Sequence, residues 1–97
     1  MVACSGKVYY TLVAAREERG IENIAIARLE QLYPFPDDEF AALLAAWPAL
    51  RRVTWVQEEP VNMGAWRSTR HRLERNLPEG VALDWVARAA AASPATG

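Results

Sequence analysis

The chain has 97 residues, of which 52% are hydrophobic and 24% are charged, and its formal net charge is −1. These values are typical of one folded globular domain with a modest core, and they do not favour binding to nucleic acid or to an anionic membrane surface. Cys4 is the only cysteine, which excludes an internal disulfide and fits a small buried thiol in a reducing compartment. No run approaches the roughly 20 apolar residues that span a bilayer, and the features of a signal peptide are absent.

The first part of the chain predicts two strands with a helix between them. Residues 2–4 form a short apolar strand, residues 7–19 form a helix that ends at Gly20, and residues 24–29 form a second strand. The side chains spaced to give the helix one buried face are Val8, Tyr9, Leu12 and Val13.

The second predicted helix begins at Asp37, after a connection that Pro34 and Pro36 make stiff. The carboxylates at positions 37–39 complement the helix dipole and can cap free N–H groups, and Pro48 ends the helix. The side chains predicted to form its buried stripe are Phe40, Leu43, Leu44 and Trp47.

The second half of the chain predicts a strand, a helix, another strand and a tail. Residues 53–56 are β-branched or aromatic and form a strand, whereas residues 64–76 form a helix. A turn at 78–80 leads to a fourth strand at 81–87. Residues 89–97 are mostly small, and Ser93-Pro94 is typical of the start of a further helix. The apolar side of the third helix consists of Trp66, Leu73 and Leu77.

Strands and helices therefore alternate along the whole chain, with linkers of a few residues. This order predicts an α/β fold with a mostly parallel sheet and helices on both faces, which is a three-layer α/β/α sandwich. The sequence contains no internal repeat that would indicate a solenoid or a propeller.

Polar residues from Gln57 onward lie where the third strand ends and the next helix begins, which is where open α/β sheets place functional crevices. Glu58 and Glu59 are adjacent on an extended segment, so alternation directs them to opposite sides and argues against a coupled acid/base pair. We expect one of these carboxylates to cap the following helix or to pair across an interface. Asn62 and Gly64 are expected to shape the loop.

Other motifs do not complete a catalytic or ligand-binding site. Ser5-Gly6-Lys7 lacks the upstream glycine and the following hydroxyl residue of a P-loop, and no G-x-G-x-x-G occurs. His71 is the only histidine, and neither a zinc ligand set nor a nucleophile–His–acid arrangement can be built around it.

The third helix is rich in arginine, at positions 67, 70, 72 and 75. These side chains fan around most of the helix, which favours a solvated or subunit-facing helix over a nucleic-acid reader. The four tryptophans, at positions 47, 55, 66 and 85, are expected in the core or at its rim, with one or two of them in a subunit interface.

Three runs of residues carry a resemblance to a known family: SGKVYY at 5–10, RLEQLYPFP at 28–36 and WVQEEPVNMGAW at 55–66. In this order they closely resemble the C-terminal region of the first, decarboxylating component of the 2-oxoglutarate dehydrogenase complex. The tail at 88–97 is similar to the segment that precedes the final helix in the same family. The motif QEEPxNxGAW favours this family over related transketolase-type domains.

The resemblance implies one transketolase C-terminal-like domain over residues 1–97, as a piece of a longer chain that stops before the final helix. A sheet face or edge would then be left uncovered. The parent implied is an enzyme of the citric acid cycle that uses thiamine diphosphate and magnesium to decarboxylate 2-oxoglutarate. Both cofactors are expected on the preceding domains, so no catalytic, cofactor-binding or metal residue is assigned to this chain.

The role implied for this piece is non-catalytic: it packs against the preceding pyrimidine-binding domain and braces a homodimer. The parent would pass succinyl to the lipoyl group of a dihydrolipoyl succinyltransferase, in the bacterial cytoplasm or, in a eukaryote, the mitochondrial matrix; we favour the bacterial setting. Neither nucleic acid nor membrane is an expected partner. The interface or regulatory candidates are Gln57, Glu58, Asn62, Gly64 and Trp66. The alternative is a free-standing α/β module that binds a nucleotide or acyl-CoA effector.

Overall fold

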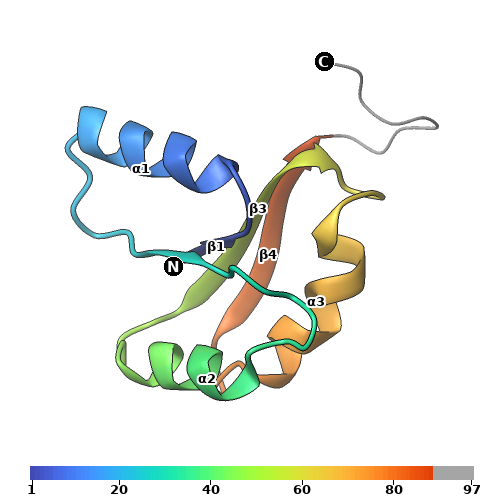
Figure 1. Cartoon of the computed structure of the whole chain (residues 1–97). Coiled ribbons are helices and arrows are strands. Elements are labelled where there is room, and N and C mark those ends of the chain that lie inside the picture. Colours follow the sequence, from blue (N-terminus) through green and yellow to red (C-terminus); the bar gives the residue numbers. More distant parts are fainter. Residues whose placement is uncertain (89–97) are drawn as a thin grey trace.

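The computed structural model describes residues 1–88, which form four strands and three helices (Figure 1). All seven elements occur in the predicted order. Their bounds are β1 Val2–Cys4, α1 Val8–Glu18, β2 Ile26–Arg28, α2 Asp37–Ala45, β3 Arg52–Pro60, α3 Ala65–Arg75 and β4 Ala82–Arg88. The further helix expected from Ser93-Pro94 lies outside the described residues.

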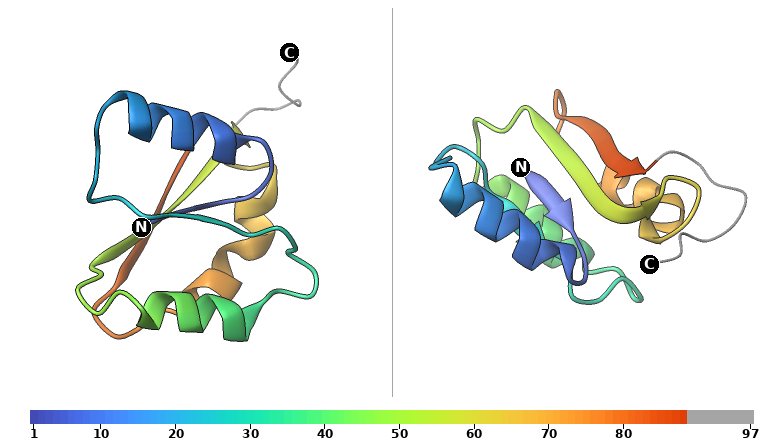
Figure 2. Two further views of the ribbon diagram at one scale, coloured as in Figure 1. Left: turned by 60° about the vertical axis from the view of Figure 1, so that its left-hand side comes forward. Right: turned by 90° about the horizontal axis from the view of Figure 1, so that it is seen from above.

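The strands form one sheet in the order β2-β1-β3-β4, and every neighbouring pair is parallel. The helix α1 covers one face of this sheet, and α2 and α3 cover the other (Figure 2). The predicted three-layer α/β/α sandwich is therefore confirmed. From β1 the chain moves to one side of the sheet and from β3 to the other, so the carboxyl ends of these two adjacent strands form the topological switch point.

The strand β3 is longer than the sequence predicts. We expected it to end at Val56, but it continues to Pro60, and a register shift against β4 lies between these two residues. Gln57 continues the inward alternation of Val53 and Trp55, because all three side chains are buried on the same side of the strand. The polar side chain of Gln57 predicts the end of the strand at this position. The hydrogen bonds described below explain why the strand continues past it.

The main core lies between the sheet and the helices α2 and α3. Its largest fully buried apolar side chains are Trp55, Phe40, Leu44, Leu73 and Val53. Burial of such a side chain contributes roughly 1.5–3 kcal/mol, so this cluster is the main apolar contribution to folding.

The predicted buried stripe of α2 is wrong at two positions. Trp47 is 49% exposed because α2 ends at Ala45, and the chain turns before the indole can reach the core. Leu43 is also exposed, since the sheet-facing side of this short helix is filled by Phe40 and Leu44.

The buried face predicted for α1 is only partly formed. Val8 is buried, whereas Tyr9, Leu12 and Val13 are half-buried. The strands β1 and β2 have three residues each, so they offer α1 a narrow platform. On β4, at the edge of the sheet, Val86 is 57% exposed.

The arginines of α3 are largely paired within the chain. Arg75 forms a bidentate ion pair with Asp37 at 2.9 and 2.8 Å, and the Arg72 guanidinium lies 4.6 Å from the ring centre of Tyr33. Arg70 pairs with Glu74 one turn along the helix. Three of the four guanidinium groups therefore have partners in the domain, as expected for a solvated helix rather than a phosphate-binding one.

Candidate interface at the carboxyl end of β3

The five candidate residues lie on one corner of the molecule, where β3 leads through residues 61–64 into α3. Gln57 and Glu58 belong to β3, Asn62 and Gly64 to the loop, and Trp66 to the first turn of α3. The structure brings three of them into direct contact, namely Gln57, Gly64 and Trp66. Glu58 and Asn62 are exposed at the surface of the same corner.

Gln57 is the centre of this corner and is only 6% exposed. Its Nε2 donates to three backbone carbonyls, those of Glu59 at 3.2 Å, Pro60 at 2.9 Å and Met63 at 2.8 Å. Its Oε1 accepts hydrogen bonds from the Trp55 indole N–H at 3.0 Å and from the backbone N–H of Trp66 at 2.8 Å. One amide therefore ties the end of β3, the loop and the start of α3 together.

The bond from Trp66 corrects our expectation for the helix cap. The first N–H groups of an α-helix have no partner within the helix, and we expected a carboxylate of Glu58 or Glu59 to serve the α3 terminus. The side-chain oxygen that accepts from Trp66 is instead the neutral Oε1 of Gln57, and both glutamates are exposed. A buried neutral amide can fill this position at lower desolvation cost than a carboxylate.

Gly64 lets the loop close on this amide. Its backbone angles are φ 67° and ψ −160°, a region that only glycine occupies readily. A Cβ at this position would lie 3.1 Å from the Cβ of Glu59 and 3.3 Å from Nε2 of Gln57. The expectation that Gly64 shapes the loop is therefore confirmed, through both its positive φ and its close approach to Glu59 and Gln57.

Trp66 adds an aromatic contact that the sequence did not indicate. Its indole is buried, and its ring centre lies 6.4 Å from that of Trp85 on β4. Trp85 is itself 44% exposed. The sequence placed both residues at the core or its rim, but pairing between α3 and β4 depends on the tertiary fold. Trp85 thus extends the candidate surface onto the neighbouring strand.

Side chains away from this corner have displaced pKa values. Burial raises the pKa of the Cys4 thiol, and the Arg75 hydrogen bond, followed by that of Asn76, lowers the pKa of the Asp37 carboxyl. A thiol with a raised pKa is a poor nucleophile. The Cys4 sulfur also lies 3.7 Å from the carbonyl oxygen of Ala27, as expected for a buried structural cysteine.

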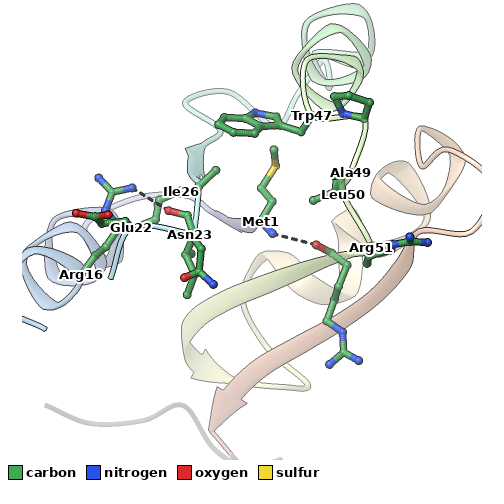
Figure 3. Close-up of a pocket in the computed structure, with 13 residues that line it drawn as sticks. Met1, Arg16, Glu22, Asn23, Ile26, Trp47, Ala49, Leu50 and Arg51 are labelled. Carbon is green, nitrogen blue, oxygen red and sulfur yellow. Dashed lines mark hydrogen bonds between the residues drawn. The ribbon is translucent and has the colours of Figure 1, made fainter. Parts of the chain in front are cut away.

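A cavity of about 910 Å³ lies at the opposite edge of the sheet, among the amino ends of β1, β2 and β3 (Figure 3). Its walls include Met1, Ile26, Trp47, Leu50 and Arg51. The Met1 side chain points toward the indole of Trp47, and the Met1 amino group faces β3. The sequence did not predict this cavity, because Trp47 was assigned to the core.

Comparison with known families matches the whole chain, residues 1–97, to a family described as 2-oxoglutarate dehydrogenase C-terminal. The chain belongs to this family. The resemblance inferred from the three sequence runs is thereby confirmed, and the parallel sheet described above is the fold expected from it.

Several 2-oxoglutarate dehydrogenases are similar to the chain over its full length. It is 50% identical over 99 residues to the 2-oxoglutarate dehydrogenase E1 component of Coxiella burnetii, with 100% of the chain and 11% of the relative covered. Identity to the E1 component of Azotobacter vinelandii is 46%, again with 100% and 11% covered. Identity to the mitochondrial 2-oxoglutarate dehydrogenase of Schizosaccharomyces pombe is 40%, with 100% and 10% covered. The chain therefore spans about a tenth of the length of these relatives.

The cofactors implied for the 2-oxoglutarate dehydrogenase family do not fit the donor set of this C-terminal piece. Residues 1–88 contain no group of three His, Cys, Asp or Glu side chains that could hold a metal ion. The Nε2 group of Gln57 already serves three carbonyls, so it has no capacity left for a phosphate. We assign no step of thiamine chemistry to these residues. None of the helices within residues 1–88 is long and apolar enough to span a bilayer.

Proposed function

We propose that this chain acts as the non-catalytic C-terminal domain of a 2-oxoglutarate dehydrogenase E1 component. The parent would decarboxylate 2-oxoglutarate with thiamine diphosphate and magnesium held by other domains. It would then pass the succinyl group to the lipoyl group of a dihydrolipoyl succinyltransferase. The family membership over residues 1–97 supports this proposal, as does identity of 40–50% to the bacterial and mitochondrial relatives described above.

The observation that carries the non-catalytic role is the complete use of the Gln57 side chain. At the switch point, where an α/β enzyme places reactive groups, this domain has an amide with five hydrogen bonds to its own chain. Such an arrangement fixes the shape of the corner and leaves no donor or acceptor of that amide for a substrate. We infer that the corner is built to present a rigid surface.

We infer further that this surface packs against the preceding domains of the parent and braces its homodimer. Glu58 and Asn62 are exposed at this corner, and the half-exposed indole of Trp85 lies against Trp66 of the same corner. An aromatic side chain surrounded by polar groups is typical of protein interfaces. Bacterial and mitochondrial relatives exist, so the parent would work in the cytoplasm or in the mitochondrial matrix.

A chimera tests the proposal. In the Azotobacter vinelandii E1 component the matched C-terminal region is replaced by residues 1–97 of this chain, and a second variant lacks the region altogether. We expect the chimera to remain dimeric and to decarboxylate 2-oxoglutarate, whereas the truncated variant loses both properties. A chimera that folds but is monomeric and inactive would overturn the proposed role. Stoichiometric binding of thiamine diphosphate to the 97-residue chain, measured by calorimetry, would overturn the non-catalytic assignment.

A further inference from the structure

The backbone of Met1 already continues β1 at its amino end. Its N–H₃⁺ group donates to the carbonyl of Arg52 at 3.0 Å, and its carbonyl accepts from the N–H of Thr54 at 2.9 Å. On the other side, the N–H of Val2 donates to the carbonyl of Ala25 at 2.8 Å. The first residue therefore lies between the two neighbouring strands with the hydrogen bonds of a parallel sheet.

Beyond Met1, residues 23–25 ahead of β2 and residues 51–52 at the start of β3 leave a slot between them. The register pairs Val2 with Ile26 on one side and with Thr54 on the other. Two positions upstream of Met1 would consequently run between residues 23–24 and residues 51–52. The N–H of Arg52 lies on the same edge of β3 as its carbonyl, so it points to the carbonyl expected from the second upstream residue. The backbone of β3 therefore offers a hydrogen-bond donor to a segment in the slot.

The walls of the slot are those of the cavity in Figure 3. Trp47 and Ile24, both exposed large apolar side chains, lie on these walls. Side chains alternate along a strand, so the second upstream residue falls on the same face as Met1, whose side chain points toward Trp47. An extended polypeptide would therefore cover an indole that is now in contact with water.

The charge at the amino group fits the same interpretation. Desolvation lowers the pKa of the Met1 amino group, which Asp84 offsets in part. A peptide N–H at this position would keep the hydrogen bond to Arg52 without bringing a charge between the strands.

We propose that the cavity at the amino edge is the seat of the segment that precedes residue 1 in a longer E1 component. This segment would extend β1 by about two residues, between β2 and β3, and cover Trp47. The inference rests on the proposed function, because the family is a C-terminal one and the matched part is only 10–11% of each relative. It assigns the cavity to a polypeptide occupant rather than to a small molecule.

The test compares two N-terminal extensions of the 97-residue chain. One is the short segment that precedes the matched region in the Coxiella burnetii relative, and the other is a Gly–Ser segment of equal length, which stays flexible. Both carry Trp85→Phe, so that Trp47 is the one exposed indole in residues 1–88. A neutral quencher then reports access to Trp47, and hydrogen exchange reports the Arg52 amide.

We expect the natural extension to abolish most of the quenching of Trp47 and to slow exchange at Arg52, and the Gly–Ser extension to do neither. If the two extensions give equal quenching and equal exchange in folded protein, the inference is wrong. An inactive chimera in the preceding experiment, together with a protected Trp47 in this one, would count against the proposed function alone. Protection of Trp47 by the Gly–Ser segment would show that any chain fills the cavity, which also contradicts the specific seat.

Discussion

The side-chain oxygen of Gln57 accepts a 2.8 Å hydrogen bond from the backbone N–H of Trp66, nine residues further along the chain. Through this bond the end of a buried strand holds the first turn of the next helix, a position that capping residues normally serve from within the turn. The amide also fixes the intervening loop through its Nε2 group. This side chain therefore joins the first turn of α3 to the end of β3 and to the loop between them.

Gln57→Glu is expected to lower the free energy of unfolding by roughly 3 kcal/mol, because it buries a carboxylate against three carbonyl oxygens. Urea unfolding at neutral pH measures this loss. The new carboxyl regains one donor when it is protonated, so part of the stability should return at acidic pH. The matched control is Glu58→Gln, the reverse change at the exposed next position, which should be nearly neutral. Equal effects of the two substitutions would contradict the role of the buried amide.

Gly64→Ala is expected to destabilise the domain by about 2–3 kcal/mol, because the added Cβ combines an unfavourable backbone region with a 3.1 Å contact to Glu59. Gly20→Ala is the comparison, since Gly20 has a similar φ of 64° but open space around its Cα. That variant should cost about 1 kcal/mol. Melting temperatures of the two variants give the contribution of the close approach. The interpretation fails if Gly20→Ala is the more damaging of the two.

Asp37 links α2 to the end of α3 and should make stability depend on acidic pH. Its carboxyl receives Arg75 and Asn76, whose hydrogen bonds lower its pKa. A group with a lowered pKa in the folded state stabilises the protein above its unfolded pKa of about 3.9, and the contribution is lost as the pH falls through the folded value. Asp37→Asn should therefore lower the melting temperature by a few degrees at neutral pH and remove this part of the acid sensitivity.

The control for this prediction is Asp38→Asn. Asp38 is exposed in the same first turn and has no ion pair within residues 1–88. Thermal scans across the acidic range should separate the two variants. Identical pH profiles would show that the contact between Asp37 and Arg75 adds nothing to stability in solution.

The amino group of Met1 should make stability depend on pH near neutrality. Desolvation lowers its pKa in the folded chain, so the unfolded chain binds more protons between the folded value and about 8. Stability should therefore rise with pH through this interval and level off above it. Unfolding in urea at several pH values between about 6 and 9 measures the slope. Acetylation of the N-terminus should abolish this part of the slope, and an unchanged slope would assign it to another group.

The sequence predicted the order of all seven elements because apolar periodicity and turn residues report local structure. It also identified the corner, since Gln57, Gly64 and Trp66 belong to one short run and meet in space. The residues it misassigned depend on distant contacts. Trp47 has the spacing of a core residue, but α2 ends before it, and its exposure follows from the turn into β3.

The pairings across the fold were equally invisible in the sequence. Asp37 lies 38 residues from Arg75, and nothing in the local pattern distinguishes this arginine from its neighbours. The cap of α3 was assigned to a carboxylate because glutamates precede the helix, whereas burial of the position favours the neutral amide of Gln57. Local rules thus locate a site, and tertiary packing decides which atom fills it.

The exposure of Val86 at the edge of the sheet has a consequence for the fate of the domain in a cell. A protease that released this region from a parent enzyme would also release β4, on which Val86 and Trp85 are exposed to water. Exposed apolar surface of this kind is bound by chaperones and promotes aggregation with other chains. The lifetime of the domain in a cell would therefore depend on the integrity of the parent enzyme. Degradation of the parent enzyme would lead to degradation of the domain.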